Sequence, residues 1–314
     1  MKSRAVPRSI VSNALALTKK FRDQIAMRWF PVSYAKIYYR ARTGKRLNYR
    51  NVQNLNEKLF WLERHWRDPL ISTCTDKYAV RQYVEDCGFG SLLNELYGVY
   101  DDASEVDVCA LPNKFVLKCT HGCKYNIFCV EKHHFDMEAA RERLNTWMGR
   151  TYGLASAEWH YSGIKPRIIA ERYIEPYDGR LMQFQLYCFN GKPTFFLARN
   201  DLTGGLGHAI RLSYDLDWKR LFYRKGEEAV ADGYEQPHNL RRMIECAREL
   251  GRPFPHVRVD FFEVGQALTL GELTFSTSAN VLSTLQDDVL ERLGRELRLP
   301  RRSWNGGGGA NARR

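Results

Sequence analysis

The alternation of hydrophobic and polar residues predicts a β-hairpin near the end of the chain. The runs His256 to Val264 and Ala267 to Phe275 both alternate between apolar and polar side chains, and Gly265 stands in the short gap between them. Alternation with a period of two is typical of a half-buried strand, and a glycine between two such runs indicates a tight turn. We therefore expect the two runs to pair as antiparallel strands.

Charged residues share one side of this hairpin. Arg258 and Asp260 lie on one face of the first strand, and Glu272 and Thr274 on one face of the second, because successive side chains alternate. Pairing then brings Asp260 beside Glu272, and two adjacent carboxylates repel unless a cation lies between them. Mg2+ fits that position, and Arg258 adds a donor for phosphate. An ordinary hairpin with surface charges is the alternative.

Similar patterns predict the remaining elements. Helical spacing and capping residues predict helices at 34–39, 54–63, 77–87, 136–148, 239–250 and 286–298. Within the helix 136–148, Ala139, Ala140 and Leu144 are expected to face inward. Short apolar runs predict strands at 96–100, 114–119, 125–130, 167–175, 183–189, 193–198 and 212–216. Asn190-Gly191 is a typical hairpin turn between two of these strands.

Length and composition indicate a globular protein. The 314 residues are enough for one large domain or for two to three subdomains around a substantial core, and 44% of them are hydrophobic. No run approaches the roughly 20 apolar residues that a membrane span needs. The N-terminus also lacks the compact apolar segment of a signal peptide. The sequence therefore predicts a cytoplasmic protein.

The net charge of +12 belongs to the first 50 residues. They hold 13 Lys or Arg against one acidic residue, Asp23, whereas the rest of the chain holds 35 charges of each sign. Apolar residues recur in this arm at helical spacing: Ile10, Ala14, Leu17, Phe21 and Ile25. A basic amphipathic helix is typical of docking on an anionic membrane surface, and packing on the body is the alternative. The neutral body predicts no nucleic-acid partner.

The eight cysteines show no paired framework, which is typical of a reducing compartment. Cys119, His121 and Cys123 do suggest zinc. However, alternate residues of one strand cannot easily close a tetrahedron, so zinc is the weaker interpretation.

Two lysines lie where a phosphate could bind. Lys118 ends an apolar run and precedes a turn that contains Gly122, whose neighbouring backbone N–H groups could cradle a phosphate. Lys77 follows Asp76 at a predicted helix start, where the helix dipole attracts anions. Taken alone, either lysine could be a solvated surface residue.

The segment 167–175 has the pattern of a nucleotide hinge. It presents Glu171, then Tyr173 and Ile174, then Glu175 before a proline. The backbone of such a segment can pair with a flat base while one carboxylate accepts from its amine and another binds ribose hydroxyls. A half-buried strand with charged ends is the alternative.

In this order, these residues resemble the ATP-grasp superfamily, and within it the TupA-like family found in bacterial polysaccharide gene clusters. The resemblance runs from about Asn51 to Pro300. It rests on the blocks Leu55-Asn-Glu-Lys-Leu-Phe-Trp-Leu, Thr75-Asp-Lys-Tyr-Ala-Val-Arg, Leu111-Pro-Asn-Lys-Phe-Val-Leu-Lys-Cys-Thr-His-Gly, Lys165-Pro-Arg-Ile-Ile-Ala-Glu, Cys188-Phe-Asn-Gly-Lys-Pro, Tyr214-Asp-Leu-Asp-Trp and Gly271-Glu-Leu-Thr-Phe.

The resemblance implies an α+β fold, the ATP-grasp fold, in which two α+β lobes hold ATP between them. Residues 1–50 would form the basic helical arm and 51–95 a helical N-terminal part. Residues 96–166 would form the lid subdomain and 167–300 the C-terminal lobe with the metal site. Residues 301–314 are expected to be a disordered tail, because their Gly-rich sequence has nothing to bury.

The resemblance also implies a role for each site residue. ATP would be bound by Lys77, Lys118, His121, Gly122, Glu171, Tyr173, Ile174, Glu175 and Asp178. Mg2+ would be held by Asp260, Glu272 and Thr274, and phosphoryl transfer would be assisted by Arg258, Lys118 and Lys124.

The chain departs from the family pattern at four places. Thr274 replaces the usual Asn, Lys124 replaces a second Gly, and Gln185 replaces a lysine. Ser276-Thr277-Ser278 stands where the family usually has Thr-Pro-Gly. These changes lie near the phosphates or the acceptor, and they indicate an altered acceptor or weakened catalysis.

The leading hypothesis is an ADP-forming carboxylate–amine ligase that acts through an acyl phosphate. It would amidate a uronic acid or peptide group of a bacterial surface polysaccharide with an amino acid, and the basic arm would fit work on a lipid-linked glycan at the inner membrane face. One alternative is a glycosyltransferase, for which Asp215-Leu-Asp217 would bind a sugar nucleotide. The others are an ATP-grasp-fold kinase and a binding protein without activity.

Overall fold

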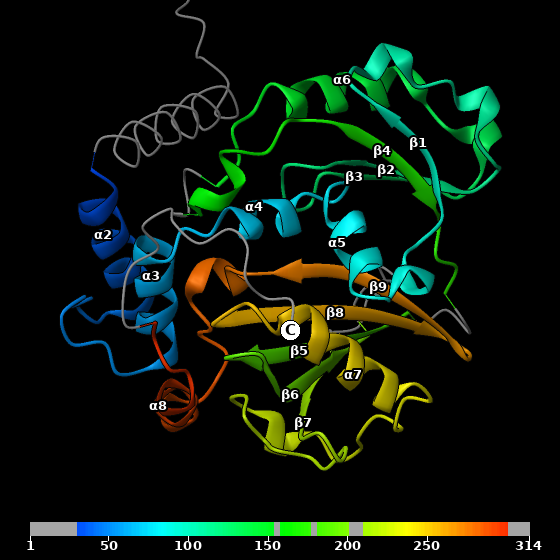
Figure 1. Cartoon of the computed structure of the whole chain (residues 1–314). Coiled ribbons are helices and arrows are strands. Elements are labelled where there is room, and N and C mark those ends of the chain that lie inside the picture. The colour runs from blue at the N-terminus through cyan, green and yellow to red at the C-terminus, as the bar shows by residue number, and fades with distance from the viewer. Residues whose placement is uncertain (1–29, 154–157, 177–180, 201–209, 301–314) are drawn as a thin grey trace, which may run out of the picture.

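Two antiparallel sheets form the frame of the protein in a computed structural model, which describes residues 30–153, 158–176, 181–200 and 210–300. One sheet has four strands in the order β1-β4-β2-β3, and the other has five in the order β7-β6-β5-β8-β9 (Figure 1). Helices pack on both sheets. This arrangement confirms the α+β class predicted from the sequence.

The four-stranded sheet contains β1 (Leu96–Tyr100), β2 (Phe115–Cys119), β3 (Asn126–Cys129) and β4 (Ile168–Arg172). Helix α6 (Met137–Met148) covers it and begins at Asp136, whose side chain accepts a hydrogen bond from the Ala139 backbone. Ala140 and Leu144 of this helix are buried against the sheet. Ala139 is exposed, contrary to expectation, because residues that share the buried face of a helix are three or four apart and Ala139 is adjacent to Ala140.

Strand β4 ends sooner than the predicted run 167–175, and it pairs with β1 and β2. It therefore lies in the four-stranded sheet, although the expected boundary at residue 167 assigned it to the other lobe. Sequence patterns indicate that a segment is a strand, but pairing between distant segments depends on tertiary contacts.

The five-stranded sheet contains β5 (Met182–Phe189), β6 (Lys192–Arg199), β7 (Arg211–Tyr214), β8 (His256–Val264) and β9 (Ala267–Thr274). The hairpin of β8 and β9 has the predicted register, with Asp260 opposite Glu272. The predicted bounds are confirmed, except that the second strand ends one residue earlier, at Thr274. The predicted pairing of the two carboxylates is also confirmed.

Each face of the five-stranded sheet is covered differently. On one face of the sheet, helix α7 (Leu240–Gly251) packs against β5, β6 and β8. On the other face, Tyr187 and Phe195 pack against α3 (Leu55–His65) and α8 (Asp287–Glu296). Gln185 and Asp260 lie on this second face, farther along the strands than the part covered by α3 and α8.

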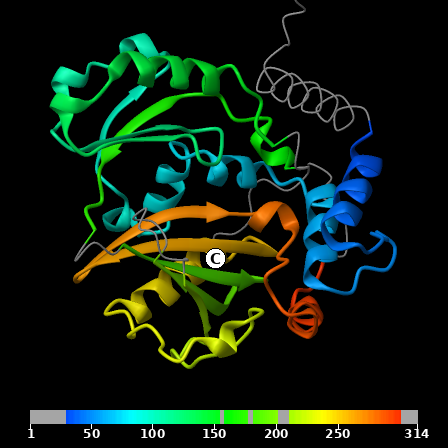
Figure 2. The ribbon, with the colours of Figure 1, turned by 180° about the vertical axis from the view of Figure 1, so that it is seen from behind.

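Two short helices lie between the sheets, namely α4 (Pro69–Thr75) and α5 (Val80–Asp86) (Figures 1 and 2). The sequence predicted one helix in this region, at 77–87. Asp68 instead caps α4, in which Pro69 is the first residue, a position that needs no backbone N–H. Helix α5 begins later than predicted because the Asp76 carboxylate accepts hydrogen bonds from the backbone of Tyr78 and Ala79.

At the N-terminal end of the described residues, α2 (Pro31–Thr43) packs on α3, and the rings of Tyr39 and Phe60 lie 5.5 Å apart. Asn54 caps α3 in a capping box with Glu57, at the predicted start of the helix 54–63. The basic amphipathic segment 10–25 and the tail 301–314 fall outside the described residues. Within the described part, no helix is long and apolar enough to cross a membrane.

Candidate active site

Four polar side chains on one face of the β8–β9 hairpin form a hydrogen-bonded group, here called the Arg258 cluster (Arg258, Asp260, Glu272 and Thr274). Arg258 donates from Nε and Nη2 to the two carboxylate oxygens of Asp260, both at 2.6 Å. Its Nη2 also lies 3.2 Å from Glu272 Oε1 and 3.1 Å from Thr274 Oγ1. The cation between the two carboxylates is therefore the guanidinium of Arg258.

Burial decides the charges in this cluster. Asp260 is fully buried, and this burial raises its pKa to about 6, although the guanidinium of Arg258 opposes the shift. Partial desolvation within the cluster would raise the pKa of Glu272, although its side chain is 45% exposed, but the positive charges of Arg258 and Lys77 lower this pKa below its usual range. Glu272 is thus a fixed negative charge at neutral pH.

Strand β5 adds two amides to the same face. Gln183 and Gln185 each donate from Nε2 to Asp260 Oδ2 at 3.2 Å. Gln185 stands where the family resemblance leads us to expect a lysine, so this chain supplies a neutral donor to Asp260 in place of a charged one. Gln183 was not predicted, although its two-residue spacing from Gln185 places both on one face.

The four-stranded sheet contributes a second charged group. Lys118 on β2 donates to Glu171 Oε2 on β4 at 2.6 Å, and Arg81 on α5 lies 3.5 Å from Glu171 Oε1. Glu171 is buried, so the two cations compensate its charge in a setting where an unpaired carboxylate would be costly. The sequence did not single out Arg81, although it ends the block that begins at Thr75.

The turn after β2 holds the side chain of a third cation, Lys77. Lys77 donates from Nζ to the carbonyl oxygen of Gly122, and burial lowers the pKa of its ammonium group. A Cβ on Gly122 would lie 2.5 Å from the ring of Tyr125, so the turn needs glycine at this position. Tyr125 itself is stacked on Trp147 with ring centroids 5.1 Å apart.

Charges from the two sheets meet in one region. Lys77 and Lys118 both lie close enough to Glu272 to lower the pKa of its carboxyl. Lys118 belongs to the four-stranded sheet, Glu272 belongs to the five-stranded sheet, and Lys77 precedes α5 between them. The structure thus brings together two lysines, an arginine and two carboxylates that lie far apart in the sequence.

The predicted hinge follows directly after β4. Tyr173 and Ile174 are half-buried, and the ring of Tyr173 lies 6.3 Å from that of Phe128. Glu175 is exposed and pairs with Lys114. Asp178 lies outside the described residues. The contact of this segment with a base stays a prediction.

Two further predicted residues lie in the turn after β2. His121 is buried, and its Nε2 lies 3.0 Å from the backbone oxygen of Trp147. Lys124 is exposed and has a positive φ of 62°, at the position where the family tends to have glycine. Among the described residues, no group of three His, Cys, Asp or Glu side chains could hold a metal ion, so the zinc interpretation gains no support.

The Asp215-Leu-Asp217 segment forms a turn after β7. Asp215 Oδ1 accepts hydrogen bonds from the backbone N–H groups of Asp217 and Lys219 at 2.9 and 2.8 Å. Its carboxylate therefore stabilises the turn, and Trp218 stacks on Tyr214 beside it.

The donor set of the Arg258 cluster fits Mg2+. This ion prefers oxygen ligands and is usually bound by one or two carboxylates together with substrate phosphates and water. Asp260 and Glu272 are cross-strand partners, and the hydroxyl of Thr274 donates to Glu272 at 2.8 Å. These three residues offer hard oxygen donors on one face of the hairpin, and Thr274 takes the place of the usual Asn.

Several solved structures resemble the chain, and no curated protein matches its sequence. D-alanine–D-alanine ligase from Bacillus anthracis is 13% identical with a TM-score of 0.41, over 70% of this chain and 62% of that one. D-cycloserine synthetase is 16% identical with a TM-score of 0.43, over 77% and 79%. L-amino acid ligase from Bacillus licheniformis is 12% identical with a TM-score of 0.43, over 69% and 47%.

A family comparison covers most of the chain. The model of the TupA-like ATP-grasp family matches residues 57–298, which include the whole Arg258 cluster as well as Lys77, Lys118 and Gly122. The resemblance drawn from the sequence blocks is thereby confirmed. The chain belongs to the TupA-like ATP-grasp family and, with it, to the ATP-grasp ligase superfamily.

Proposed function

We propose that the protein is an ATP-dependent, ADP-forming carboxylate–amine ligase. The observation that carries this proposal is the convergence of Lys77 and Lys118 on Glu272, beside the ion pair of Arg258 and Asp260. Triphosphate binding needs several cations at one place, and these residues supply three of them. The neighbouring carboxylates supply the oxygens that a divalent ion requires.

The reaction would proceed in two steps. A substrate carboxylate oxygen attacks the γ-phosphorus of ATP, so that an acyl phosphate forms and ADP leaves. An amine nitrogen then attacks the acyl carbon, phosphate leaves with the bonding electron pair, and the amine loses a proton as the amide forms. Both steps depend on charge neutralisation and on exclusion of water more than on a protein nucleophile.

Each residue of the site has a role in this scheme. Lys77 and Lys118 would bind the phosphates, and Arg258 would stabilise the negative charge of the phosphoryl group in transfer. Asp260 fixes the plane of the Arg258 guanidinium through two hydrogen bonds. When bound, Mg2+ would neutralise phosphate charge, and Asp260, Glu272 and Thr274 would hold it.

The substrates are also part of the proposal. We take the carboxylate to be a uronic acid or peptide group of a bacterial surface polysaccharide and the amine to be an amino acid. This choice rests on the TupA-like family, which is found in polysaccharide gene clusters. The basic residues 1–50 would hold the enzyme at the inner membrane face, near a lipid-linked glycan.

Nucleotide binding and turnover by the purified full chain test the proposal. ATP binding with Mg2+ is measured by calorimetry, and ADP release is measured with pooled amino acids and uronic-acid glycans. We expect Asp260→Asn and Lys118→Ala each to weaken ATP binding at least about tenfold, while Lys165→Ala, which removes an exposed lysine paired with Asp101, leaves it intact.

The dependence on each substrate separates the possible reactions. ADP release that requires both a glycan and an amino acid supports the ligase. ADP release with a glycan alone identifies a kinase instead. A chain that binds a sugar nucleotide and not ATP would refute the nucleotide site altogether.

A further inference from the structure

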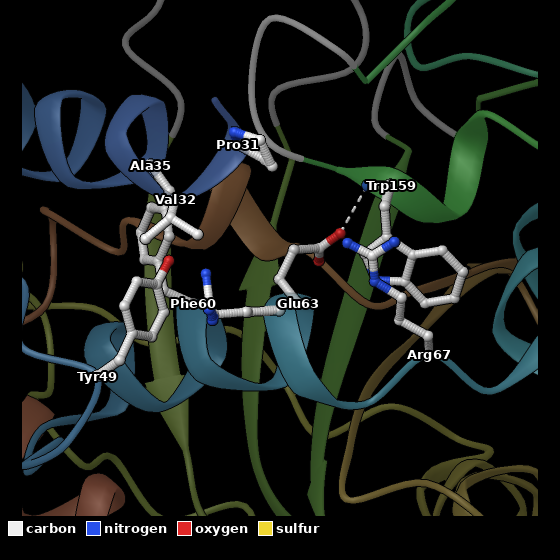
Figure 3. Close-up of a pocket in the computed structure, with 9 residues that line it drawn as sticks. Pro31, Val32, Ala35, Tyr49, Phe60, Glu63, Arg67 and Trp159 are labelled. Carbon is white, nitrogen blue, oxygen red and sulfur yellow. Dashed lines mark hydrogen bonds between the residues drawn. The ribbon is translucent and has the colours of Figure 1, made fainter. Parts of the chain in front are cut away.

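A hollow in the surface lies away from the Arg258 cluster, between α2, α3 and the short helix η6 (Trp159–Tyr161) (Figure 3). We call it the α2–α3 pocket. Val32 and Phe60 form part of its apolar wall, and the rings of Tyr49 and Trp159 stand on two sides. Pockets of this kind, apolar with a few polar groups, are typical of ligand sites.

Two arginines line the pocket, and each is stacked on one of its rings. The Arg64 guanidinium lies 5.2 Å from the ring centroid of Tyr49, and that of Arg67 lies 5.6 Å from Trp159. Figure 3 shows Arg67 beside Trp159. Stacking fixes the plane of a guanidinium and leaves its N–H donors free at the edge.

Neither arginine has an acidic partner within the part of the chain that the structure describes. Both side chains are exposed, and the charged neighbour in the pocket, Glu63, is engaged elsewhere. Its Oε1 accepts a hydrogen bond from the Trp159 backbone at 2.8 Å and lies 3.2 Å from His160 Nδ1. The donors of Arg64 and Arg67 are therefore available to an anion.

We propose that the α2–α3 pocket binds an acidic sugar unit of the acceptor glycan, an inference that rests on the proposed function. The apolar face of a sugar ring would lie on Tyr49 or Trp159, and its carboxylate would accept hydrogen bonds from Arg64 and Arg67. The unit bound here is a neighbour of the reacting one, because the reacting carboxylate must lie at the Arg258 cluster.

A buried chain of polar contacts joins the pocket to the active site. His160, which lies beside Glu63, places its Nε2 at 3.4 Å from the hydroxyl of Ser276. Ser276 comes two residues after Thr274 and donates to the carboxylate of Glu158. His160 and Ser276 are both buried. The pocket wall and the end of β9 are thus held by one framework, which supports an acceptor site over an unrelated surface hollow.

Calorimetry with the full chain, without nucleotide, tests the inference. The probes are a trisaccharide of galacturonic acid, the neutral galactose trisaccharide and inorganic phosphate. We expect the acidic trisaccharide to bind, and the double change Arg64→Gln and Arg67→Gln to weaken its binding at least about tenfold, because two charge-assisted contacts are lost. The neutral trisaccharide and phosphate are expected to bind far more weakly.

Arg143→Gln is the matched control, because Arg143 is also exposed and stacked on a tryptophan, Trp147, but lies on α6 outside the pocket. It should leave the affinity unchanged. Equal binding of the acidic and neutral trisaccharides would overturn the inference. Equal binding by the double variant or equally tight binding of phosphate alone would do the same.

The outcome is separate from that of the proposed function. If the chain binds ATP but no acidic trisaccharide, the pocket inference fails and the ligase proposal stands. If it binds the acidic trisaccharide through Arg64 and Arg67 but never binds ATP, the pocket is a sugar site and the ligase proposal fails.

Discussion

Arg258 and Asp260 form a two-pronged ion pair in which both donor–acceptor distances are 2.6 Å. The carboxylate is fully buried, and Arg258 also bridges to Glu272 on the next strand at 3.2 Å. The pair therefore does two things. It compensates a buried charge in the core of the hairpin, and it presents the remaining donors of the guanidinium toward the site.

We predict that Arg258→Met lowers the free energy of unfolding by about 3–5 kcal/mol, because loss of one partner leaves the other buried and uncompensated. The measurement is urea unfolding of both proteins at pH 7.5. Arg252→Gln is the control, since Arg252 is exposed and its partner Glu249 lies 4.0 Å away. That change should shift stability by less than about 0.5 kcal/mol. Equal unfolding midpoints for Arg258→Met and wild type would contradict the prediction.

Lys118 is expected to contribute more to ATP affinity than to the free energy of unfolding. Lys118→Met removes a cation from the phosphate region but leaves Glu171 with its second partner, Arg81, at 3.5 Å. We predict that ATP affinity falls at least about tenfold, as for the loss of one charge-assisted contact. Calorimetric titration with Mg2+ and ATP measures the affinity, and Lys165→Met serves as control. A larger effect on the unfolding midpoint than on ATP affinity would show that Lys118 is structural.

The sequence predicted the β8–β9 hairpin well because its information is local. A period of two and a short glycine turn determine which residues face each other, so Asp260 opposite Glu272 followed directly. The sequence did not predict that Arg258 would lie between these carboxylates. The direction of a long side chain depends on the packing around it, and here Gln183 and Gln185 occupy the other side of Asp260.

Pairing across long stretches of sequence was less predictable. Lys118 and Glu171 were both singled out, but as separate ligands, and their mutual contact depends on the register between β2 and β4. Helix α4 was missed because a proline is commonly taken as a helix breaker, whereas Pro69 is the first residue of α4. The roles proposed for the site residues came from the family resemblance. Most of the helices and strands were predicted from the local pattern of apolar and polar residues.

The tight packing around Gly122 leads to a prediction about stability and ATP binding. In Gly122→Ala the new Cβ would lie 2.5 Å from the ring of Tyr125, which cannot retreat easily because it is stacked on Trp147. We expect a loss of about 1–3 kcal/mol in stability, as for other overpacked sites, together with weaker ATP binding because Lys77 bonds the Gly122 carbonyl. Thermal unfolding and ATP titration measure the two effects.

Gly163→Ala is the control for this change, since a Cβ at Gly163 meets no atom within 4 Å. It should leave both the unfolding temperature and the ATP affinity near those of wild type. If Gly122→Ala behaved in the same way, the close approach of the turn to Tyr125 would have no energetic consequence.

His256 gives the protein a specific dependence on pH. Its ring is buried beside the rings of Tyr187 and Phe189, at centroid distances of 6.2 and 5.5 Å. Burial lowers the pKa of His256 to about 3. In the unfolded chain the same imidazole takes up a proton near pH 6.5. Between these two values the unfolded state binds more protons, so the free energy of unfolding falls as the pH falls.

We predict that His256→Phe removes this part of the pH dependence. At pH 5 the wild type should have lost about 2 kcal/mol through His256 relative to pH 7.5, and the variant should not show that loss. Urea unfolding of both proteins at the two pH values measures the difference. His134→Gln, a change at an exposed histidine, should keep the wild-type behaviour. If His256→Phe lost as much stability between pH 7.5 and 5 as the wild type, the buried imidazole would have to be protonated in the folded protein, contrary to the packing of His256 between Tyr187 and Phe189.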